Sequence, residues 1–161
     1  MKKKTYKSTG ESIESFLDKI LVICPRCELC AEITPANSQN SSIFAPRQLV
    51  CVHCGISKEW SGNAIRIGNY SDPPVDSYFD LPLFLAEPCC GHTLWAYNLR
   101  QLNVIEDYVS AALRQHEKSE KYGWNNRSIV SRLPRWIISA KNRDMVLKAI
   151  AKLKTKIQVV A

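Results

Sequence analysis

The sequence predicts an α+β protein, in which a small antiparallel β ribbon precedes a strand pair and a helical C-terminal unit. Two observations support this prediction. Two C-x-x-C pairs lie between residues 24 and 54, next to short runs of apolar and β-branched residues, which is typical of strands joined by tight turns. From residue 98 onward, apolar residues instead recur every three or four positions, which predicts amphipathic helices.

The size and composition fit one domain of ordinary size, or a small module tied to a larger one. The chain has 161 residues, of which 45% are apolar, so it can bury a core of its own. No apolar run approaches the roughly 20 residues that a membrane-spanning helix needs. The lysines at the start of the chain have no apolar stretch behind them, unlike those of a signal peptide. We expect a cytoplasmic protein.

The first part of the chain divides into a tail and a ribbon. Residues 1–20 combine a basic tail with a short helix at Ser12–Ile20, where apolar residues recur at helical spacing. Residues 21–70 form the predicted ribbon, and 37–42 is a polar loop within it. The turn-rich stretch SDPPVD ends the ribbon. The strands that we expect lie at residues 20–24, 47–51, 56–60 and 64–70.

Residues 75–161 form the predicted second unit, of α/β type with basic C-terminal helices. Two apolar strands enclose a turn at residues 88–91. Asn98 can cap a helix that runs to about Glu120, and Gly123 ends it. A helical region over residues 128–139 is interrupted at Pro134, which starts a new helix or kinks this one. The last helix is predicted from Asn142 to Ile157 by an apolar stripe at helical spacing.

The cysteine pattern favours metal binding over disulfides. The chain has seven cysteines, an odd number, and four of them form the two C-x-x-C pairs. Because no secretory signal precedes them, we expect a reducing compartment, where such pairs are typical of metal ligands. Two C-x-x-C turns are the common ligand set of a tetrahedral structural Zn²⁺ site.

The stretch CPRCELC offers two overlapping pairs, and the site has room for one of them. Pro25 preorganises the turn between Cys24 and Cys27, whereas the rival pair, Cys27 and Cys30, encloses a carboxylate. We therefore expect the first pair to bind, with Cys30 as a small buried apolar residue. In the second stretch, CVHCG, a glycine follows the second cysteine and suits the turn. The predicted Zn²⁺ ligands are Cys24, Cys27, Cys51 and Cys54.

The order C-P-x-C, polar loop, strand, C-x-x-C-G and strand resembles the zinc-ribbon family, including the N-terminal ribbon of transcription factor IIB-like proteins. The resemblance covers about residues 20–62, under a third of the chain. This sequence has Glu28 where the first turn of the family often has glycine. The resemblance implies a four-cysteine zinc ribbon and leaves open what the ribbon binds.

The second half is similar to segments of small bacterial proteins that are named only for their zinc ribbon. The similarity rests on CCGHTLWAYN, the amphipathic helix after it, and RLPRWIISAKNRDMVLKAI. It implies no established activity. Cys90 and His92 could contribute to a second metal site, but adjacent cysteines on an extended strand cannot easily both face one ion. We expect Cys89, Cys90 and His92 to form a strand end and turn without a metal.

Enzymatic activity has no motif to support it, because the sequence contains no nucleophile elbow, no phosphate-binding loop and no H-E-x-x-H. We therefore expect a non-catalytic protein. Residues 127–161 contain nine Lys/Arg and one acid, whereas the first 126 residues are nearly neutral. Basic side chains attract phosphates, which predicts a nucleic-acid partner in a regulatory role. The residues expected to bind it are Arg127, Arg132, Arg135, Lys141, Arg143, Lys148 and Lys152.

Two other interpretations of the basic end remain open. The lysines are also compatible with a soluble helix whose side-chain stems cover an apolar stripe. Alternatively, the protein is a protein-binding module such as an adaptor, an antitoxin or an immunity protein. Such a module would use its basic end, or the acidic segment between Asp72 and Asp107, to dock its partner.

Overall fold

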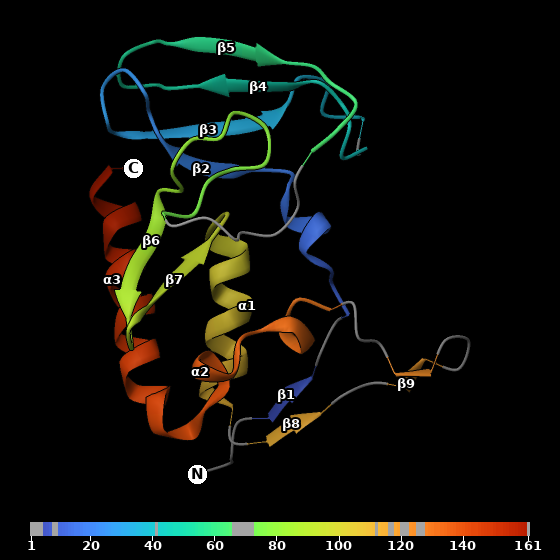
Figure 1. The fold of residues 1–161 in the computed structure, drawn as a ribbon, viewed down its shortest axis with the longest axis vertical. Helices are drawn as coiled ribbons and strands as arrows, with labels where there is room; N and C mark the ends of the chain where they lie inside the picture. Colours follow the sequence, from blue (N-terminus) through green and yellow to red (C-terminus); the bar gives the residue numbers. More distant parts are fainter. Residues whose placement is uncertain are drawn as a thin grey trace.

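The computed structural model shows a mixed α+β fold, which confirms the predicted class (Figure 1). A four-stranded sheet lies across one end of the molecule, and the helices and a β hairpin lie beneath it. The structure describes residues 5–7, 10–40, 42–65, 73–111, 113–115, 118–119, 123–124 and 128–160.

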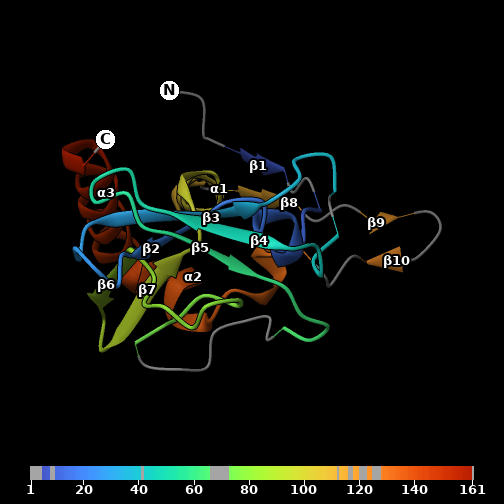
Figure 2. The same cartoon turned by 90° about the horizontal axis from the view of Figure 1, so that it is seen from above.

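The ribbon is an antiparallel sheet with the strand order β2-β3-β4-β5. Its strands are β2 (Ile20–Ile23), β3 (Cys30–Pro35), β4 (Arg47–Val50) and β5 (Ser57–Trp60). Ile33 of β3 pairs with Ile20 on one side and Leu49 on the other, and all three side chains are fully buried. The sheet therefore has an apolar face built from these side chains. Seen from above, the sheet lies over the middle of the molecule (Figure 2).

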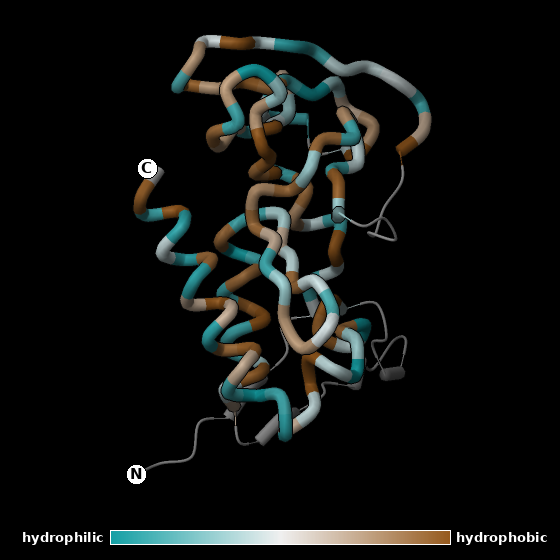
Figure 3. The backbone as a smooth tube through the Cα atoms, turned by 60° about the vertical axis from the view of Figure 1, so that its left-hand side comes forward, coloured by the Kyte–Doolittle hydropathy of each residue, from teal (hydrophilic) through white to brown (hydrophobic). Residues whose placement is uncertain are grey.

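The second unit begins with a hairpin and continues with helices. The hairpin strands are β6 (Leu85–Cys89) and β7 (His92–Ala96). The helices that pack around it are α1 (Leu99–Ser110), the 3-10 helix η2 (Val130–Arg132), α2 (Arg135–Ile138), the 3-10 helix η3 (Ala140–Asn142) and α3 (Arg143–Val160). Apolar and polar segments alternate along α3 (Figure 3), whose apolar residues Val146, Ile150 and Leu153 are fully buried. The apolar stripe predicted for this helix is thus its core face.

Several predicted boundaries are wrong. Helix α1 ends at Ser110 rather than near Glu120, and Ala111 is extended. A short strand β8 (Leu113–Gln115) follows and pairs in parallel with β1 (Thr5–Lys7). Pairing between segments so far apart in sequence overrides local helical propensity, and the local pattern cannot reveal it. Two further short strands, β9 (Lys118–Ser119) and β10 (Gly123–Trp124), form an antiparallel pair.

The N-terminal helix is also shorter than predicted. Only η1 (Ile13–Phe16), a 3-10 helix, is helical, because Ile20 already belongs to β2. No strand is predicted from the sequence at β3, which the structure places at the centre of the ribbon between β2 and β4. The strand expected at 64–70 lies mostly outside the described residues, as does most of the basic tail. Among the described helices, none has both the length and the apolar content needed to cross a membrane.

The inner edge of the ribbon is bonded to the second unit through its backbone. Leu21 donates to the Tyr97 carbonyl at 2.8 Å and accepts from the Phe84 amide at 3.0 Å, while Ile23 donates to the Pro82 carbonyl at 2.9 Å. β2 therefore has hydrogen-bond partners along both edges. One cluster of buried residues joins the ribbon to the second unit; it includes Phe16, Ile33, Leu49, Leu83, Tyr97 and Tyr108.

Two buried polar side chains, Asn98 and Asp76, hold the chain segments next to this interface in place by hydrogen bonds to the backbone. Asn98 caps α1 by accepting from the Gln101 amide at 2.9 Å, as its position predicts. The Asn98 side chain also donates to the Phe16 carbonyl at 2.9 Å and the Lys19 carbonyl at 2.8 Å. Asp76 is 1% exposed and accepts from three backbone amides, those of Tyr78, Phe79 and Leu81. Both side chains thus tie a loop to the core by satisfying backbone groups.

Candidate metal centre

Two cysteine-containing turns lie at the same end of the ribbon (Figure 1). The first knuckle, Cys24–Leu29, connects β2 to β3, and the second knuckle, Cys51–Ile56, connects β4 to β5. Successive antiparallel strands place every second turn at the same end of a sheet. The strand order β2-β3-β4-β5 therefore brings the two knuckles together.

The first knuckle is closed by two backbone hydrogen bonds. The Cys24 amide donates to the Leu29 carbonyl at 2.7 Å, and the Glu28 amide donates to the Cys24 carbonyl at 3.0 Å. The Arg26 amide also points at the Cys24 sulfur, at 3.4 Å. Glu28 adopts a left-handed conformation with φ of 64°, which residues other than glycine rarely do.

The second knuckle repeats this pattern 27 residues later. The Cys51 amide donates to the Ile56 carbonyl at 3.1 Å, and the Gly55 amide donates to the Cys51 carbonyl at 2.8 Å. Gly55 has φ of 77° and occupies the position that corresponds to Glu28. The two turns are therefore two copies of one local structure, and they differ in the residue that bears the left-handed conformation.

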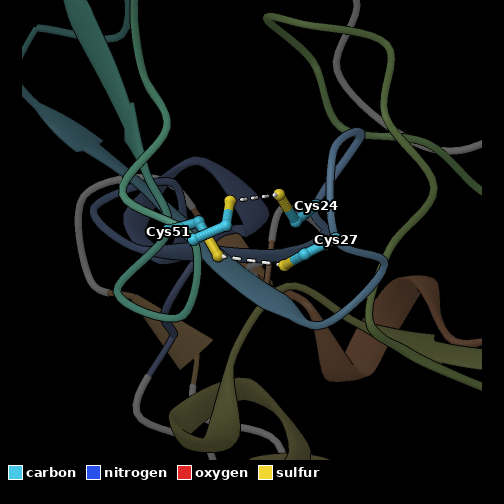
Figure 4. A group of neighbouring side chains, drawn as sticks. Cys24, Cys27 and Cys51 are labelled. Atoms are coloured by element: carbon cyan, nitrogen blue, oxygen red, sulfur yellow. Dashed lines mark hydrogen bonds between the residues drawn. The ribbon is translucent and has the colours of Figure 1, made fainter.

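The four predicted ligands converge, and Figure 4 shows how Cys24 and Cys27 of the first knuckle face Cys51 of the second. The Cys24 and Cys54 sulfurs are 3.6 Å apart, those of Cys27 and Cys51 are 3.5 Å apart, and all four lie within 4.8 Å of one another. Sulfurs about 2.3 Å from a tetrahedral metal are about 3.8 Å from each other, so this spacing fits one ion. A disulfide requires about 2.05 Å, and all seven cysteines are free thiols.

The electrostatics of the cluster favour ionisation at one sulfur. Burial opposes ionisation of Cys24, but the Cys27 and Arg26 amides and the Cys54 and Cys27 thiols outweigh it and lower the pKa of Cys24 to about 6. At Cys27 the Leu29 amide lowers the pKa, yet burial and the other three sulfurs raise it to about 12. Four sulfurs this close cannot all ionise without a cation among them.

Cys30 does not join the cluster, as the sequence predicts. Its thiol points to the carbonyl of Ala31 at 3.9 Å, and Cys30 is half-buried rather than buried as predicted. Burial, together with the negative charges of Glu32 and Cys51, raises the pKa of Cys30 to about 11. Of the two overlapping pairs in CPRCELC, the structure therefore brings Cys24 and Cys27 to the second knuckle.

Cys89, Cys90 and His92 lie at the hairpin turn between β6 and β7. The Cys89 and Cys90 sulfurs are 3.6 Å apart, and the His92 ring stacks on Trp136 with 5.0 Å between centroids. In the part of the chain that the structure describes, these residues do not belong to any group of three or more ligands.

The predicted nucleic-acid-binding residues differ in their surroundings. Arg132, Arg135, Lys141 and Lys148 are exposed. Arg143 is half-buried, and Lys152 is exposed but lies 3.5 Å from Glu87. Arg127 lies outside the described residues. Arg132, Arg135, Lys141 and Lys148 lie on η2, α2, η3 and α3, respectively.

Two other lysines of α3 are engaged by neighbouring elements. Lys154 pairs with Glu106 of α1 at 2.9 Å. Lys156 donates to the Phe84 carbonyl at 2.8 Å and lies 4.3 Å above the Phe84 ring. The positive charge near the C-terminal end of α3 therefore stabilises the packing of the helix.

Leu29 and Ile56 close the knuckles with their carbonyls, a role that the cysteine pattern does not predict. A signal for them exists, because an apolar residue follows the second cysteine by two positions in both C-x-x-C pairs. Comparisons with protein-family models, curated proteins and solved structures give no match for this chain. The assignment of the cluster thus rests on its geometry.

Proposed function

We propose that the protein is a structural zinc-ribbon protein that binds nucleic acid through the exposed basic side chains of its C-terminal region. The observation that carries the proposal is the convergence of four cysteine sulfurs from two equivalent turns. The ribbon then acts as a rigid element, and the chemistry of the protein is recognition rather than catalysis.

Zinc is the metal that this donor set favours. Thiolates are soft ligands, and a tetrahedral set of four is typical of structural Zn²⁺ and of iron–sulfur sites. Four thiolates within 4.8 Å of one another complete the coordination of a single ion and leave no open position for water or substrate. When bound, Zn²⁺ supplies a cross-link between the two knuckles. The thiolates of Cys24, Cys27, Cys51 and Cys54 hold it in place.

The proposed nucleic-acid surface is defined by Arg132, Arg135, Lys141 and Lys148. All four side chains are exposed. Asp144 is the one acid in residues 128–161, so little negative charge opposes phosphate there. Binding would derive mainly from contacts to phosphates, which carry no sequence information.

Charge-reversal variants test whether this surface, rather than exposed lysines elsewhere, binds nucleic acid. Arg135→Glu and Lys148→Glu should each weaken binding to single-stranded and duplex oligonucleotides, for every sequence tested, and lower the salt dependence by about one unit of slope. Lys58→Glu, on the exposed strand β5, is the matched control and should bind like the wild type. Fluorescence anisotropy over a salt series measures both quantities.

The absence of binding to any oligonucleotide at low salt, or binding that does not respond to salt, would contradict the nucleic-acid part of the proposal. A protein partner would then be the better explanation of the charge. Metal analysis tests the zinc part separately, with about one Zn²⁺ per purified chain expected. A chain that binds oligonucleotides but contains no metal would overturn the zinc ribbon alone.

A further inference from the structure

Of the adjacent cysteines Cys89 and Cys90, Cys90 occupies a backbone position that does not suit a cysteine. They end β6 and begin a two-residue hairpin turn, in which Cys90 has φ of 54° and Gly91 has φ of 77°. Two positive φ values are characteristic of a type I′ turn, whose first position prefers Asn, Asp or Gly. A cysteine in the left-handed region is destabilised by about 1 kcal/mol. Local rules of this kind are most often broken at functional sites.

The two thiols are already in contact. Their sulfurs are 3.6 Å apart, and within the described residues neither belongs to the four-sulfur cluster of the ribbon. Cys89 is 7% exposed and packs in the core of the second unit, whereas Cys90 is half-buried. Solvent therefore reaches Cys90 first, and Cys89 lies beside it as a second thiol.

We propose that Cys89 and Cys90 are a redox-modification site, which a small disulfide such as oxidised glutathione converts reversibly into a vicinal disulfide. This inference does not depend on the proposed function. The Cys90 thiolate attacks one sulfur of oxidised glutathione, so that a mixed disulfide forms and one glutathione thiolate leaves. The Cys89 thiolate then attacks the Cys90 sulfur and expels the second glutathione.

The step balances in atoms and electrons. Two protein thiols lose two electrons and two protons, and one glutathione disulfide becomes two glutathione thiols. No other oxidant is required. Burial is the largest influence on Cys89 and, with the neighbouring Cys90 and Glu87, raises its pKa to about 11. Cys89 is therefore the slower nucleophile, which suits it to the second, intramolecular step.

The geometry also makes the bond reversible. Adjacent Cα atoms across a trans peptide are about 3.8 Å apart, whereas ordinary disulfides span about 4.4 to 6.8 Å. A disulfide between neighbours is consequently strained, and strained disulfides are the easily reduced ones. We therefore expect a regulatory modification rather than a structural cross-link.

Oxidation at this turn should change the surroundings of Trp136 on α2. Cys89 and His92 are the pair that closes the hairpin, and the His92 ring lies nearly parallel to Trp136, with 9° between the planes. Bringing the sulfurs from 3.6 Å to about 2.05 Å must alter the turn that holds His92. The fluorescence of Trp136 should change with the redox state.

Intact-mass measurement of the full chain in glutathione buffers tests the proposal. With excess oxidised glutathione, the wild type should lose the mass of two hydrogens, and peptide mapping should place the disulfide at Cys89–Cys90. Excess reduced glutathione should reverse it. Cys89→Ser should stop at a stable glutathione adduct on Cys90, and Cys90→Ser should remain unmodified over the same time. Cys30→Ser, which removes a half-buried thiol elsewhere, should form the vicinal disulfide like the wild type.

Two controls keep the outcome decisive. The fluorescence change should be present in the wild type and absent from both Cys90→Ser and Trp136→Phe, and the metal content should not change on oxidation. A wild-type chain that stops at a glutathione adduct, or that links Cys89 or Cys90 to another cysteine, would overturn the proposal. A chain that resists oxidation while its denatured form reacts would overturn it as well, and this comparison needs no variant.

Discussion

The two knuckles have the same internal hydrogen bonds but different settings in the molecule. The first knuckle follows β2, the inner edge of the ribbon, which is bonded to residues 82–84 and Tyr97. The second knuckle lies between β4 and β5, and the described residues place no further strand beside β5, whose residues Ser57, Lys58 and Glu59 are exposed. One copy of the turn is thus supported by the second unit, while the other is supported by the sheet and the proposed metal.

This difference predicts that a bound metal would stabilise the two knuckles unequally. A loop that is closed by neighbouring strands keeps its shape without an ion, whereas a loop at a sheet edge depends on the cross-link. The C-terminal end of α3 also lies near the knuckle end of the sheet (Figures 1 and 2), and Lys156 influences the pKa of Cys30 there. The supported side of the site is therefore the first knuckle.

The largest effect should come from removing a ligand. Cys24→Ser and Cys51→Ser should each abolish metal binding, because one missing thiolate leaves an incomplete tetrahedral set. Each variant should thereby lose the free energy of metal binding, which is on the order of 10 kcal/mol at the 1 M standard state. Metal content measured by mass spectrometry under native conditions checks this. Cys30→Ser, with a thiol outside the cluster, should keep the metal; loss of metal in Cys30→Ser but not in Cys24→Ser would show that the pairing is wrong.

Chelation of the wild type should then reveal the inequality of the knuckles. The amides of Cys51 and Gly55, which close the second knuckle, should exchange about 100-fold faster without metal, a loss of about 3 kcal/mol in local protection. The amides of Leu21 and Ile23, which bond to the second unit, should change much less. Hydrogen exchange followed by NMR resolves these positions. Equal loss of protection at both sides would contradict the comparison.

A single buried side chain, Arg47, anchors strand β4, which leads into the second knuckle. Arg47 begins β4 and is 2% exposed. Its guanidinium donates to the Leu17 carbonyl at 3.0 Å and the Ser42 carbonyl at 3.2 Å, and it lies 4.7 Å from the centre of the Tyr78 ring. This anchor joins the ribbon to Leu17 at the C-terminal end of η1, to the polar loop and to the second unit.

Arg47→Met should therefore lower the free energy of unfolding by about 2 kcal/mol, because carbonyls that accept from a charged donor lose their partner. Gln48→Ala, at the next position on the other face, removes only an exposed contact to Ser57 and should change stability by less than about 0.5 kcal/mol. Urea unfolding of the metal-loaded proteins measures both. Equal effects would show that Arg47 is not an anchor.

The sequence predicts the sites that depend on short-range chemistry. The ligands follow from two C-x-x-C turns, the cap of α1 from Asn98, and the start of α2 from Pro134, and each of these residues lies where its local pattern places it. A strand such as β3 cannot be found in this way, because it is stabilised by hydrogen bonds to β2 and β4 on its two sides. The end of α1 at Ser110 is missed for the same reason, since β8 pairs with a strand more than 100 residues away.

The buried polar anchors are the other part that local patterns do not reveal. Arg47 and Asp76 look like ordinary surface residues in the sequence, and their partners are carbonyls and amides of loops. Any residue type can supply a backbone group, so no pairing signal exists. On α3 the side-chain partners are just as hard to predict. Lys154 pairs with Glu106 of α1, a residue 48 positions earlier.

The smallest expected effect concerns the position at which the knuckles differ. Gly55 has φ of 77° and a Cβ there would meet no atom within 4 Å, so Gly55→Ala adds backbone strain alone and should weaken metal binding by about 1 kcal/mol, or about fivefold in Kd. Glu28, at φ of 64°, already bears that strain in the first knuckle. Glu28→Gly should relieve it, but glycine also gives the unfolded chain more freedom, so the gain should be no more than about 0.5 kcal/mol. Competition with a chelator of known affinity measures both variants on the same scale. If Glu28→Gly weakens binding as much as Gly55→Ala does, the carboxylate rather than the backbone sets the behaviour of the first knuckle, and the two turns are not equivalent.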